Sequence, residues 1–193
     1  KKTLRVYFRA AYGAGKLSFP LFDNPGGLAR FDRILLRNGG NRSWPYWDRD
    51  QRREADYVND EWARRAQLEM GGLNARGTYA QLYLNGVYWG LYNVTERPDD
   101  KFLAGHLGGP DTDYDLIKAD EDLGDIPVAD AGTLAAYEEL MALLRVESVS
   151  DALHAEIAAR VDLVDLADFI ILTHYIGKTD WPNHNWLAYR KRV

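Results

Sequence analysis

The hydrophobic period changes part of the way along this chain, and that change limits the folds it can adopt. Near the N-terminus Leu4 and Val6 alternate with polar residues, a period of two that predicts a half-buried strand. From Thr133 onward, apolar residues recur every three or four positions, which is typical of amphipathic helices. Strand patterns followed by helix patterns predict an α+β fold with segregated layers. We therefore expect a β-rich half over about residues 1–118 and a helical half over about residues 119–193.

The clearest local feature is Asn85-Gly86, a dipeptide that supplies the two positive φ angles of a type I′ turn. It predicts a hairpin with strands over residues 79–84 and 87–94. The predicted register gives one aliphatic face, with the pairs Leu84 and Val87, Leu82 and Trp89, and Ala80 and Leu91. The other face is expected to carry Tyr79, Tyr83, Tyr88 and Tyr92, with Gln81 opposite Gly90. A glycine inside a strand indicates a bulge, tight packing or the close approach of a flat ligand.

Capping residues and apolar spacing predict the first helices. Asn59 is expected to cap a helix that ends near Met70, because acidic residues fill its first turn and Gly71-Gly72 follows its last. Its apolar face would be formed by Trp62, Ala63, Ala66 and Met70. A shorter helix is expected over about residues 99–106. The preceding segment, residues 42–56, has no clear period and is expected to be a surface loop with aromatic anchors.

Three helices are predicted in the second half of the chain. Thr133 and Ser150 are expected to cap two amphipathic helices. The third begins at Asp162 and is apolar on nearly every face, which predicts the central buried helix of this half. Between the two halves, the acidic run over about residues 120–130 lacks the glycine and glutamate positions of a calcium-binding EF-hand and is expected to be a solvated loop.

Composition excludes several classes of protein. The net charge of −5 over 193 residues argues against nucleic acid as a partner, because neutralising phosphates requires a basic face. The chain has no cysteine, which excludes disulfides and cysteine-ligated zinc. No apolar run approaches the length of a membrane span, so no transmembrane segment is expected. Because the first residues already alternate like a strand, we expect the chain to begin inside a larger protein.

Asp180 and Asn185 are the residues whose chemistry is most suggestive. They lie in a short polar connection rich in tryptophan, between the apolar helix and a strand-like run that starts at Leu187. Phosphoryl transfer to a hydroxyl needs a carboxylate that orients the nucleophile and an oxygen ligand that holds magnesium near the phosphates. Protein kinases place an asparagine five positions after the catalytic aspartate, which is the spacing found here. The alternative is that Asp180 and Asn183 only turn the chain after the helix.

Three segments resemble one family in the order in which they occur. They are Leu82 to Glu96, with the core Asn-Gly-x-Tyr-x-Gly-x-Tyr, then Asp115-Leu116-Ile117-Lys118, and then Thr179 to Tyr189. The first strand and Leu36-Arg37-Asn38-Gly39-Gly40 are similar as well. On these residues the chain resembles the CotH kinase family, of the spore coat protein H type. The resemblance implies an atypical protein-kinase-like fold in a single domain over residues 1–193, truncated at both ends.

The resemblance also implies a function and roles for particular residues. Members of the family bind ATP with a divalent metal, Mg²⁺ or Mn²⁺, and phosphorylate Ser or Thr of partner proteins, including coat or surface proteins. Asp180 matches the catalytic aspartate, and Asn185 is the expected metal ligand. Lys2, Arg5, Glu96 and Lys118 are the expected nucleotide contacts, with surface cations on strand edges as the alternative for the basic ones. The family implies a location in the spore coat, outside the cell or at its surface.

One part of the family pattern is not found here. The family carries a second acidic motif downstream of the Asp180 loop, whereas no acidic residue follows Asp180 in this sequence. The expectation is therefore either a fragment or a protein that has lost a metal ligand. Two other functions stay open: a non-catalytic coat or surface assembly module, and a carbohydrate-binding domain that uses Trp44, Tyr46 and Trp47. Walker-type phosphate loops and histidine-based zinc sites fit less well, because the required spacings are missing.

Overall fold

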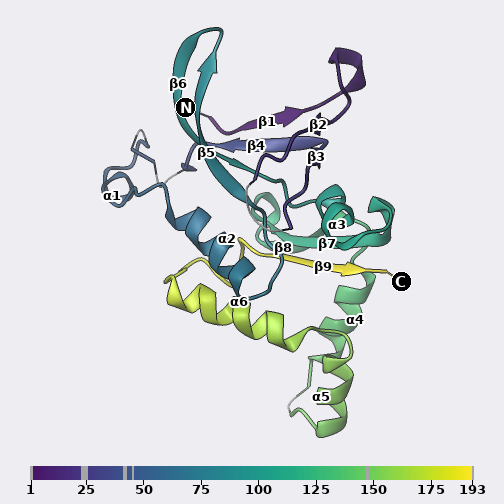
Figure 1. Cartoon of the computed structure of the whole chain (residues 1–193). Coiled ribbons are helices and arrows are strands. Elements are labelled where there is room, and N and C mark those ends of the chain that lie inside the picture. Colours follow the sequence, from purple (N-terminus) through teal and green to yellow (C-terminus); the bar gives the residue numbers. More distant parts are fainter. Residues whose placement is uncertain (1, 23–25, 41–42, 45, 147, 193) are drawn as a thin grey trace.

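The computed structural model describes residues 2–22, 26–40, 43–44, 46–146 and 148–192. It is a mixed α+β structure, as predicted, with helices and antiparallel sheets in both halves of the chain. Figure 1 shows a four-stranded sheet near the N-terminus, a three-stranded sheet that contains the last strand, and helices beneath them. Within the described residues, no helix is both long and apolar enough to cross a membrane.

The first sheet has the strand order β1-β4-β6-β5, and all its pairs are antiparallel. Its members are β1 (Leu4–Tyr7), β4 (Arg33–Arg37), β5 (Gly77–Leu84) and β6 (Val87–Thr95). A separate pair, β2 (Leu17–Ser18) and β3 (Arg30–Phe31), follows the short 3-10 helix η1 (Ala10–Tyr12). The predicted alternation in β1 is present, since Leu4 and Val6 are partly buried while Arg5 and Tyr7 are exposed. Val6 and Leu36 pack on a core of Phe22, Phe31, Ile34 and Val94.

The β5–β6 hairpin turns at Asn85-Gly86 as predicted, but most of its predicted register is wrong. Leu84 pairs with Val87 as expected, whereas Leu82 pairs with Gly90, Ala80 with Tyr92 and Gln81 with Leu91. The cause is a bulge next to Tyr83, which pairs with Tyr88 and leaves Trp89 as the extra residue. Since one added residue exchanges the two faces of a strand, Tyr92 lies in the core while Tyr83 and Tyr88 are exposed.

Helix α2 (Asn59–Glu69) packs with a different face from the predicted one. Its fully buried residues are Glu61 and Arg64, whereas Trp62 and Met70 are exposed. Asn59 is the first residue of the helix and not its cap; Asp56 accepts hydrogen bonds from the N–H groups of Val58 and Asn59. Helix α2 therefore contacts the sheet through polar groups, because Glu61 and Arg64 both form hydrogen bonds with Asn93 of β6, while Trp62 stacks on Tyr175 of the last helix.

The second sheet has the order β8-β7-β9, again antiparallel, and contains a strand that the sequence did not predict. Its strands are β7 (Tyr114–Asp120), β8 (Ile126–Ala131) and β9 (Leu187–Lys191). The acidic run was expected to be a solvated loop, but only the 3-10 helix η4 (Glu121–Leu123) and its flanking turns connect β7 to β8. The boundary expected near residue 118, between the β-rich half and the helical half, lies inside β7. Strand β9, at the end of the chain, pairs with β7 in this sheet.

Helix α3 (Asp100–Leu107) begins after its cap Asp99, close to the predicted position. It packs on β7 through a second core of Phe102, Leu103, Tyr114 and Leu116. The 3-10 helix η3 (Asp111–Asp113) leads from α3 into β7. Residues 42–56 were predicted to be a loop, but the short helix α1 (Arg49–Arg53) forms there after Asp48, whose side chain caps it.

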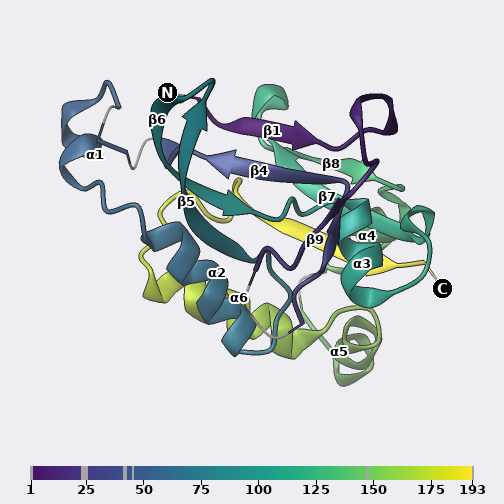
Figure 2. The ribbon, with the colours of Figure 1, turned by 45° about the horizontal axis from the view of Figure 1, so that its top comes forward.

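The last three helices are α4 (Ala135–Leu143), α5 (Asp151–Ala158) and α6 (Leu163–Tyr175). Ser150 caps α5 as predicted, and Asp162 caps α6 and is not its first residue. The predicted central buried helix is wrong, because only Leu172 and Thr173 of α6 are buried and Val164 is 71% exposed. Helix α6 lies beside α2, and α5 lies at one end of the molecule (Figures 1 and 2). The helices of the second half therefore expose much of the apolar surface that their periodicity predicts to be buried.

Candidate functional site

The loop of residues 178–186, which we call the Asp180 loop, connects α6 to the edge strand β9. The chain leaves α6 through Gly177, whose φ of 64° is a conformation that glycine adopts at low cost. The N–H of Lys178 donates to the carbonyl of Thr173, 3.1 Å away. Trp181 packs edge-on against Phe169 of α6, and Trp186 stacks on Tyr137 of α4. The tryptophans therefore anchor a polar loop to two helices.

Asp180 and Asn185 contact each other directly. The Asn185 Nδ2 donates a hydrogen bond of 2.5 Å to Asp180 Oδ2. Asn185 has a φ of 63°, a left-handed conformation that asparagine adopts more readily than most residues. The second carboxylate oxygen, Asp180 Oδ1, is enclosed and has no hydrogen-bond partner within the described part of the chain. Asn185 therefore orients the carboxylate, and the second oxygen is left without a hydrogen bond.

His184 brings a second carboxylate to the Asp180 loop. Its Nε2 lies 3.6 Å from Asp180 Oδ2, and its Nδ1 lies 3.3 Å from Asp125 Oδ1. Asp125 belongs to the turn between η4 and β8, so the imidazole lies between carboxylates from two separate segments. Sequence reasoning missed this arrangement, because nothing in a single sequence shows that this turn adjoins the loop.

Sequence reasoning also missed Lys178, a cation within the loop itself. The Lys178 Nζ donates to the carbonyl of Asn185 at 2.7 Å and interacts electrostatically with Asp180 and with Asp60 of α2. Burial lowers the pKa of Lys178, and this effect outweighs the attraction of the two carboxylates. Asp60 Oδ2 forms an ion pair with Nη1 of Arg37, the last residue of β4, and the two atoms are 2.5 Å apart. Asp60 therefore joins the end of β4 to α2.

The four residues predicted to bind nucleotide lie in different environments. Glu96 is buried, and its carboxylate accepts from the N–H of Arg76 at 2.8 Å and lies 2.9 Å from His106 Nε2. Lys118 pairs with Asp130 at 2.8 Å and lies in register with Leu187, directly after the Asp180 loop. Lys2 and Arg5 are exposed and belong to the β1 segment, on the edge of the other sheet. Lys118 is therefore at the same end of a sheet as Asp180, whereas Glu96 already has protein partners.

The metal ligands offered by the loop are few. Among the described residues, no group of three or more histidines and acidic residues could hold a metal ion. Mg²⁺, however, is commonly bound by one or two carboxylates together with water and substrate phosphates. Asp180 Oδ1, which has no hydrogen-bond partner among the described residues, and the carboxamide oxygen of Asn185 are hard oxygen donors of the type that Mg²⁺ or Mn²⁺ prefers. The pair therefore fits a metal that also binds a nucleotide.

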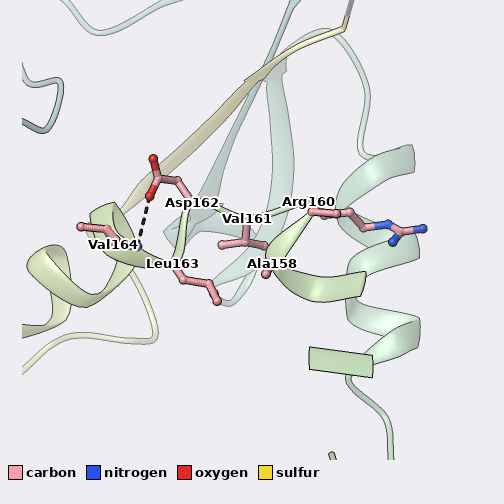
Figure 3. Close-up of a pocket in the computed structure, with 7 residues that line it drawn as sticks. Ala158, Arg160, Val161, Asp162, Leu163 and Val164 are labelled. Carbon is pink, nitrogen blue, oxygen red and sulfur yellow. Dashed lines mark hydrogen bonds between the residues drawn. The ribbon is translucent and has the colours of Figure 1, made fainter. Parts of the chain in front are cut away.

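Two hollows lie away from Asp180. The first, of about 460 Å³, is lined by residues 158–164 at the junction of α5 and α6. In Figure 3 the Asp162 carboxylate bonds to the N–H of Val164, and the Arg160 side chain extends away from that bond. The second, of about 520 Å³, lies between residues 28–32 and α3 and includes Lys16, Lys101 and Asp111. Neither contains a residue of the Asp180 loop.

The aromatic residues proposed for sugar binding are largely exposed. Trp44 packs on Tyr57 with ring centroids 5.1 Å apart, and Tyr46 packs on Trp47 at 5.6 Å. Trp47 is 79% exposed. The Tyr46 and Trp47 rings are inclined to each other by 41° and directly precede α1, in a different part of the chain from the Asp180 loop.

A comparison with protein families gives one match. The model of the family described as CotH kinase protein matches residues 65–193. The matched region is more than half of the chain and contains the β5–β6 hairpin, Lys118 and the whole Asp180 loop. No curated protein and no solved structure matches the chain.

Proposed function

This chain belongs to the CotH kinase family, and from that premise we propose that it supports ATP- and divalent-metal-dependent phosphoryl transfer to Ser or Thr of coat or surface proteins. The observation that carries the proposal is the Asp180 carboxylate, with one oxygen hydrogen-bonded to Asn185 and the other without a hydrogen-bond partner among the described residues. A catalytic aspartate of a phosphotransferase needs this combination, since it must be held in place and still accept a hydrogen bond from the attacking hydroxyl.

Each residue of the loop has a role in the proposal. Asp180 orients the substrate hydroxyl and accepts its proton as the hydroxyl attacks the γ-phosphate. Asn185 would hold Mg²⁺ or Mn²⁺ through its carboxamide oxygen, and the metal when bound would neutralise charge on the phosphates. Asn185 also fixes the carboxylate through its Nδ2, so the side chain loses little freedom when substrate binds.

The nucleotide contacts form a second part of the proposal. Lys118 is the favoured residue among the four predicted from sequence, because it lies beside the start of β9 and its ammonium is partly exposed. Lys2 and Arg5 have exposed side chains, and they would serve only if the nucleotide extended to β1. Glu96 would act indirectly, by holding His106 and the backbone of Arg76.

A second candidate is a non-catalytic assembly module with the same fold. The exposed apolar side chains of α6, with Ile171 60% exposed, favour it because such surfaces are typical of protein interfaces. In this alternative the Asp180 loop would be a structural connection, and ATP would neither stabilise the protein nor be consumed.

The test is incubation of the protein with ATP and Mg²⁺ or Mn²⁺, followed by mass spectrometry of the protein and of an added Ser/Thr-containing acceptor. We expect metal-dependent phosphate on Ser or Thr, together with a rise in melting temperature when ATP and metal are present, because a ligand that binds the native state stabilises it. No phosphate and no thermal shift with either metal would favour the assembly module.

A further inference from the structure

Strand β9 is an edge strand with one unpaired side. In the order β8-β7-β9 it pairs with β7 alone, and Figure 1 shows it on the outside of that sheet. Within the described part of the chain, no backbone hydrogen bond joins β9 to another strand. Alternate residues of an edge strand direct their N–H and C=O groups away from the neighbouring strand. The outer side of β9 therefore offers a row of main-chain donors and acceptors.

The side chains of β9 leave this edge accessible. All five of its residues are exposed, with Leu187 at 46% and Tyr189 at 40%. The opposite edge of the sheet is different, because β8 contains Pro127, which has no N–H to donate, and the charged Asp130. Residues of these kinds protect an edge from further pairing. The first three residues of β9 carry no such protection, so β9 is the edge of this sheet that suits an added strand.

The position of β9 connects this edge to the candidate site. The strand begins at Leu187, directly after Asn185 and Trp186 of the Asp180 loop. Both strand pairs of the sheet are antiparallel. A chain that continued this pattern on β9 would run toward the Asp180 loop, and two residues past Leu187 would carry it about 7 Å farther along the loop.

The other end of β9 carries positive charge. Arg190 Nε lies 3.2 Å from Asp115 Oδ2, yet the arginine side chain is 53% exposed, and a guanidinium has five N–H donors. Oppositely charged side chains that face each other on adjacent strands stabilise the pairing. A strand added to β9 would therefore be favoured by an acidic residue opposite Arg190.

We propose that β9 binds an extended segment of the acceptor protein as an additional antiparallel strand. This inference rests on the proposed function and specifies how the substrate is recognised. The main chain of the segment pairs with the outer side of β9, and an acidic residue lies opposite Arg190. The acceptor Ser or Thr follows roughly five positions later, beside the Asp180 loop.

The binding experiment uses fluorescence anisotropy without nucleotide, and the probe is the labelled synthetic peptide Asp-Val-Gln-Val-Gln-Ser. Methylating alternate backbone nitrogens tests strand addition, because only one alternate set can donate to β9. We expect N-methylation of one set, either both Val or both Gln, to weaken binding by about tenfold or more. N-methylation of the other set should have a much smaller effect. Equal effects of the two sets would overturn strand addition.

Variants of the protein locate the peptide. Tyr189→Glu should weaken binding by about tenfold or more, because it places a carboxylate on the edge that receives the acidic peptide. Ile126→Glu is the matched control, since Ile126 is an exposed apolar residue of the opposite edge strand, and it should bind like the wild type. Replacing Asp of the peptide with Lys should weaken binding to the wild type several-fold and have little effect on binding to Arg190→Gln.

Hydrogen exchange supplies a second measurement. The peptide should slow exchange in residues 187–191 and leave residues 126–131 unchanged. Absence of peptide binding by the wild type, or equal binding by folded Tyr189→Glu, would overturn strand addition.

The outcomes for the two proposals are distinguishable. Peptide binding that depends on β9, in a protein that transfers no phosphate, would support strand addition and count against the transfer reaction. Phosphate transfer to acceptors that leave exchange in β9 unchanged would overturn strand addition and leave the transfer reaction standing.

Discussion

At the scale of single residues, Asn185 combines a structural role with a chemical one. Its φ of 63° is tolerated by asparagine and by glycine, whereas its side chain holds Asp180. Asn185→Gly therefore removes the carboxamide without straining the backbone. We expect this variant to need a several-fold higher Mg²⁺ concentration for half-maximal phosphoryl transfer, measured by titrating the metal at fixed ATP.

Asn185→Ala provides the comparison for backbone strain. It also lacks the carboxamide and in addition carries a Cβ in the left-handed region, which costs about 1 kcal/mol. It should show the same metal requirement as Asn185→Gly with lower thermal stability. If Asn185→Gly titrated with Mg²⁺ like the wild type, Asn185 would not be a metal ligand.

The sequence identified part of this site and missed the rest for a physical reason. The step from Asp180 to Asn185 is local, so its spacing could be recognised before the structure was known. Lys178 was within the same loop, but the burial that lowers the pKa of its ammonium depends on what the fold packs around it. Asp125 reaches His184 only because β7, β8 and β9 form one sheet. Contacts of that kind depend on the fold and leave no mark on local spacing.

At the scale of elements, α2 is held on the first sheet by a buried charged network. Glu61 accepts hydrogen bonds from Arg64 at 2.7 Å, from Asn93 of β6 at 3.1 Å and from Arg65 at 2.7 Å. A Cβ at Gly77 of β5 would lie 2.0 Å from Glu61 Oε2, so this strand can approach the carboxylate only with a glycine there. The network takes the place of the apolar contact that the helix pattern predicted.

Glu61→Gln tests the contribution of this network. Burial alone would raise the pKa of Glu61, but hydrogen bonds from Arg65, Asn93 and Arg64 together lower it from the usual 4.5. At pH 7 we expect Glu61→Gln to reduce the free energy of unfolding by roughly 2–3 kcal/mol, because Arg64 loses a charged partner while Asp60 still pairs with it. The measurement is urea denaturation, with Glu69→Gln on the exposed end of α2 as the control.

The pH dependence has a definite sign. Since the folded pKa of Glu61 lies below the unfolded value of 4.5, its contribution is present above pH 4.5 and is lost as the pH falls through the folded pKa. The gap in stability between wild type and Glu61→Gln should therefore narrow below pH 4.5. A constant gap from pH 7 to pH 3 would show that Glu61 does not gain stability from its charge.

The hairpin shows how far an element can be read from its sequence. Asn85-Gly86 fixes the turn through backbone conformation alone, and the turn was predicted correctly. The bulge next to Tyr83 changes which tyrosines of the hairpin face the core. With the bulge, Tyr92 is fully buried and its hydroxyl donates to the carbonyl of Lys2. The register therefore follows tertiary packing and not the local alternation.

At the scale of the whole molecule, the second sheet joins the middle of the chain to its end. Asp115 of β7 is buried and accepts bonds from the N–H of Thr133 at 2.7 Å and from Arg192 Nη1 at 2.6 Å. Arg190 of β9 lies 3.2 Å from its other oxygen. Asp115 thus fastens β9, and with it the Asp180 loop, to the rest of the protein.

Asp115→Asn should loosen this attachment. We expect a loss of about 1–2 kcal/mol in unfolding free energy, because the buried Asp115 loses its charged hydrogen bond with Arg192, whereas the arginines left behind are partly exposed to water. Hydrogen exchange in residues 187–191 should accelerate by more than it does elsewhere. The exposed Asp122→Asn serves as the control, and equal effects of the two substitutions on exchange in β9 would contradict the anchoring role.

The whole fold was predictable only in outline. The change of hydrophobic period gave the α+β class correctly, because periodicity reflects which face of an element is apolar. It could not place β8, whose acidic surroundings resemble a solvated loop, or show that β9 pairs with β7. It also predicted α6 to be buried, although its apolar residues are largely exposed in this structure. Apolar composition shows that a helix can be buried, whereas burial depends on what packs against it.

The central claim is that Asp180 acts in phosphoryl transfer, and the most direct test is the rate of γ-phosphate transfer from ATP by wild type and Asp180→Asn. Both proteins should be compared at saturating ATP and Mg²⁺, after calorimetry has shown that both bind ATP. We expect the rate for Asp180→Asn to fall by about 100-fold or more, the usual contribution of a positioned acid–base group. Equal rates for two folded, ATP-binding proteins would contradict the claim.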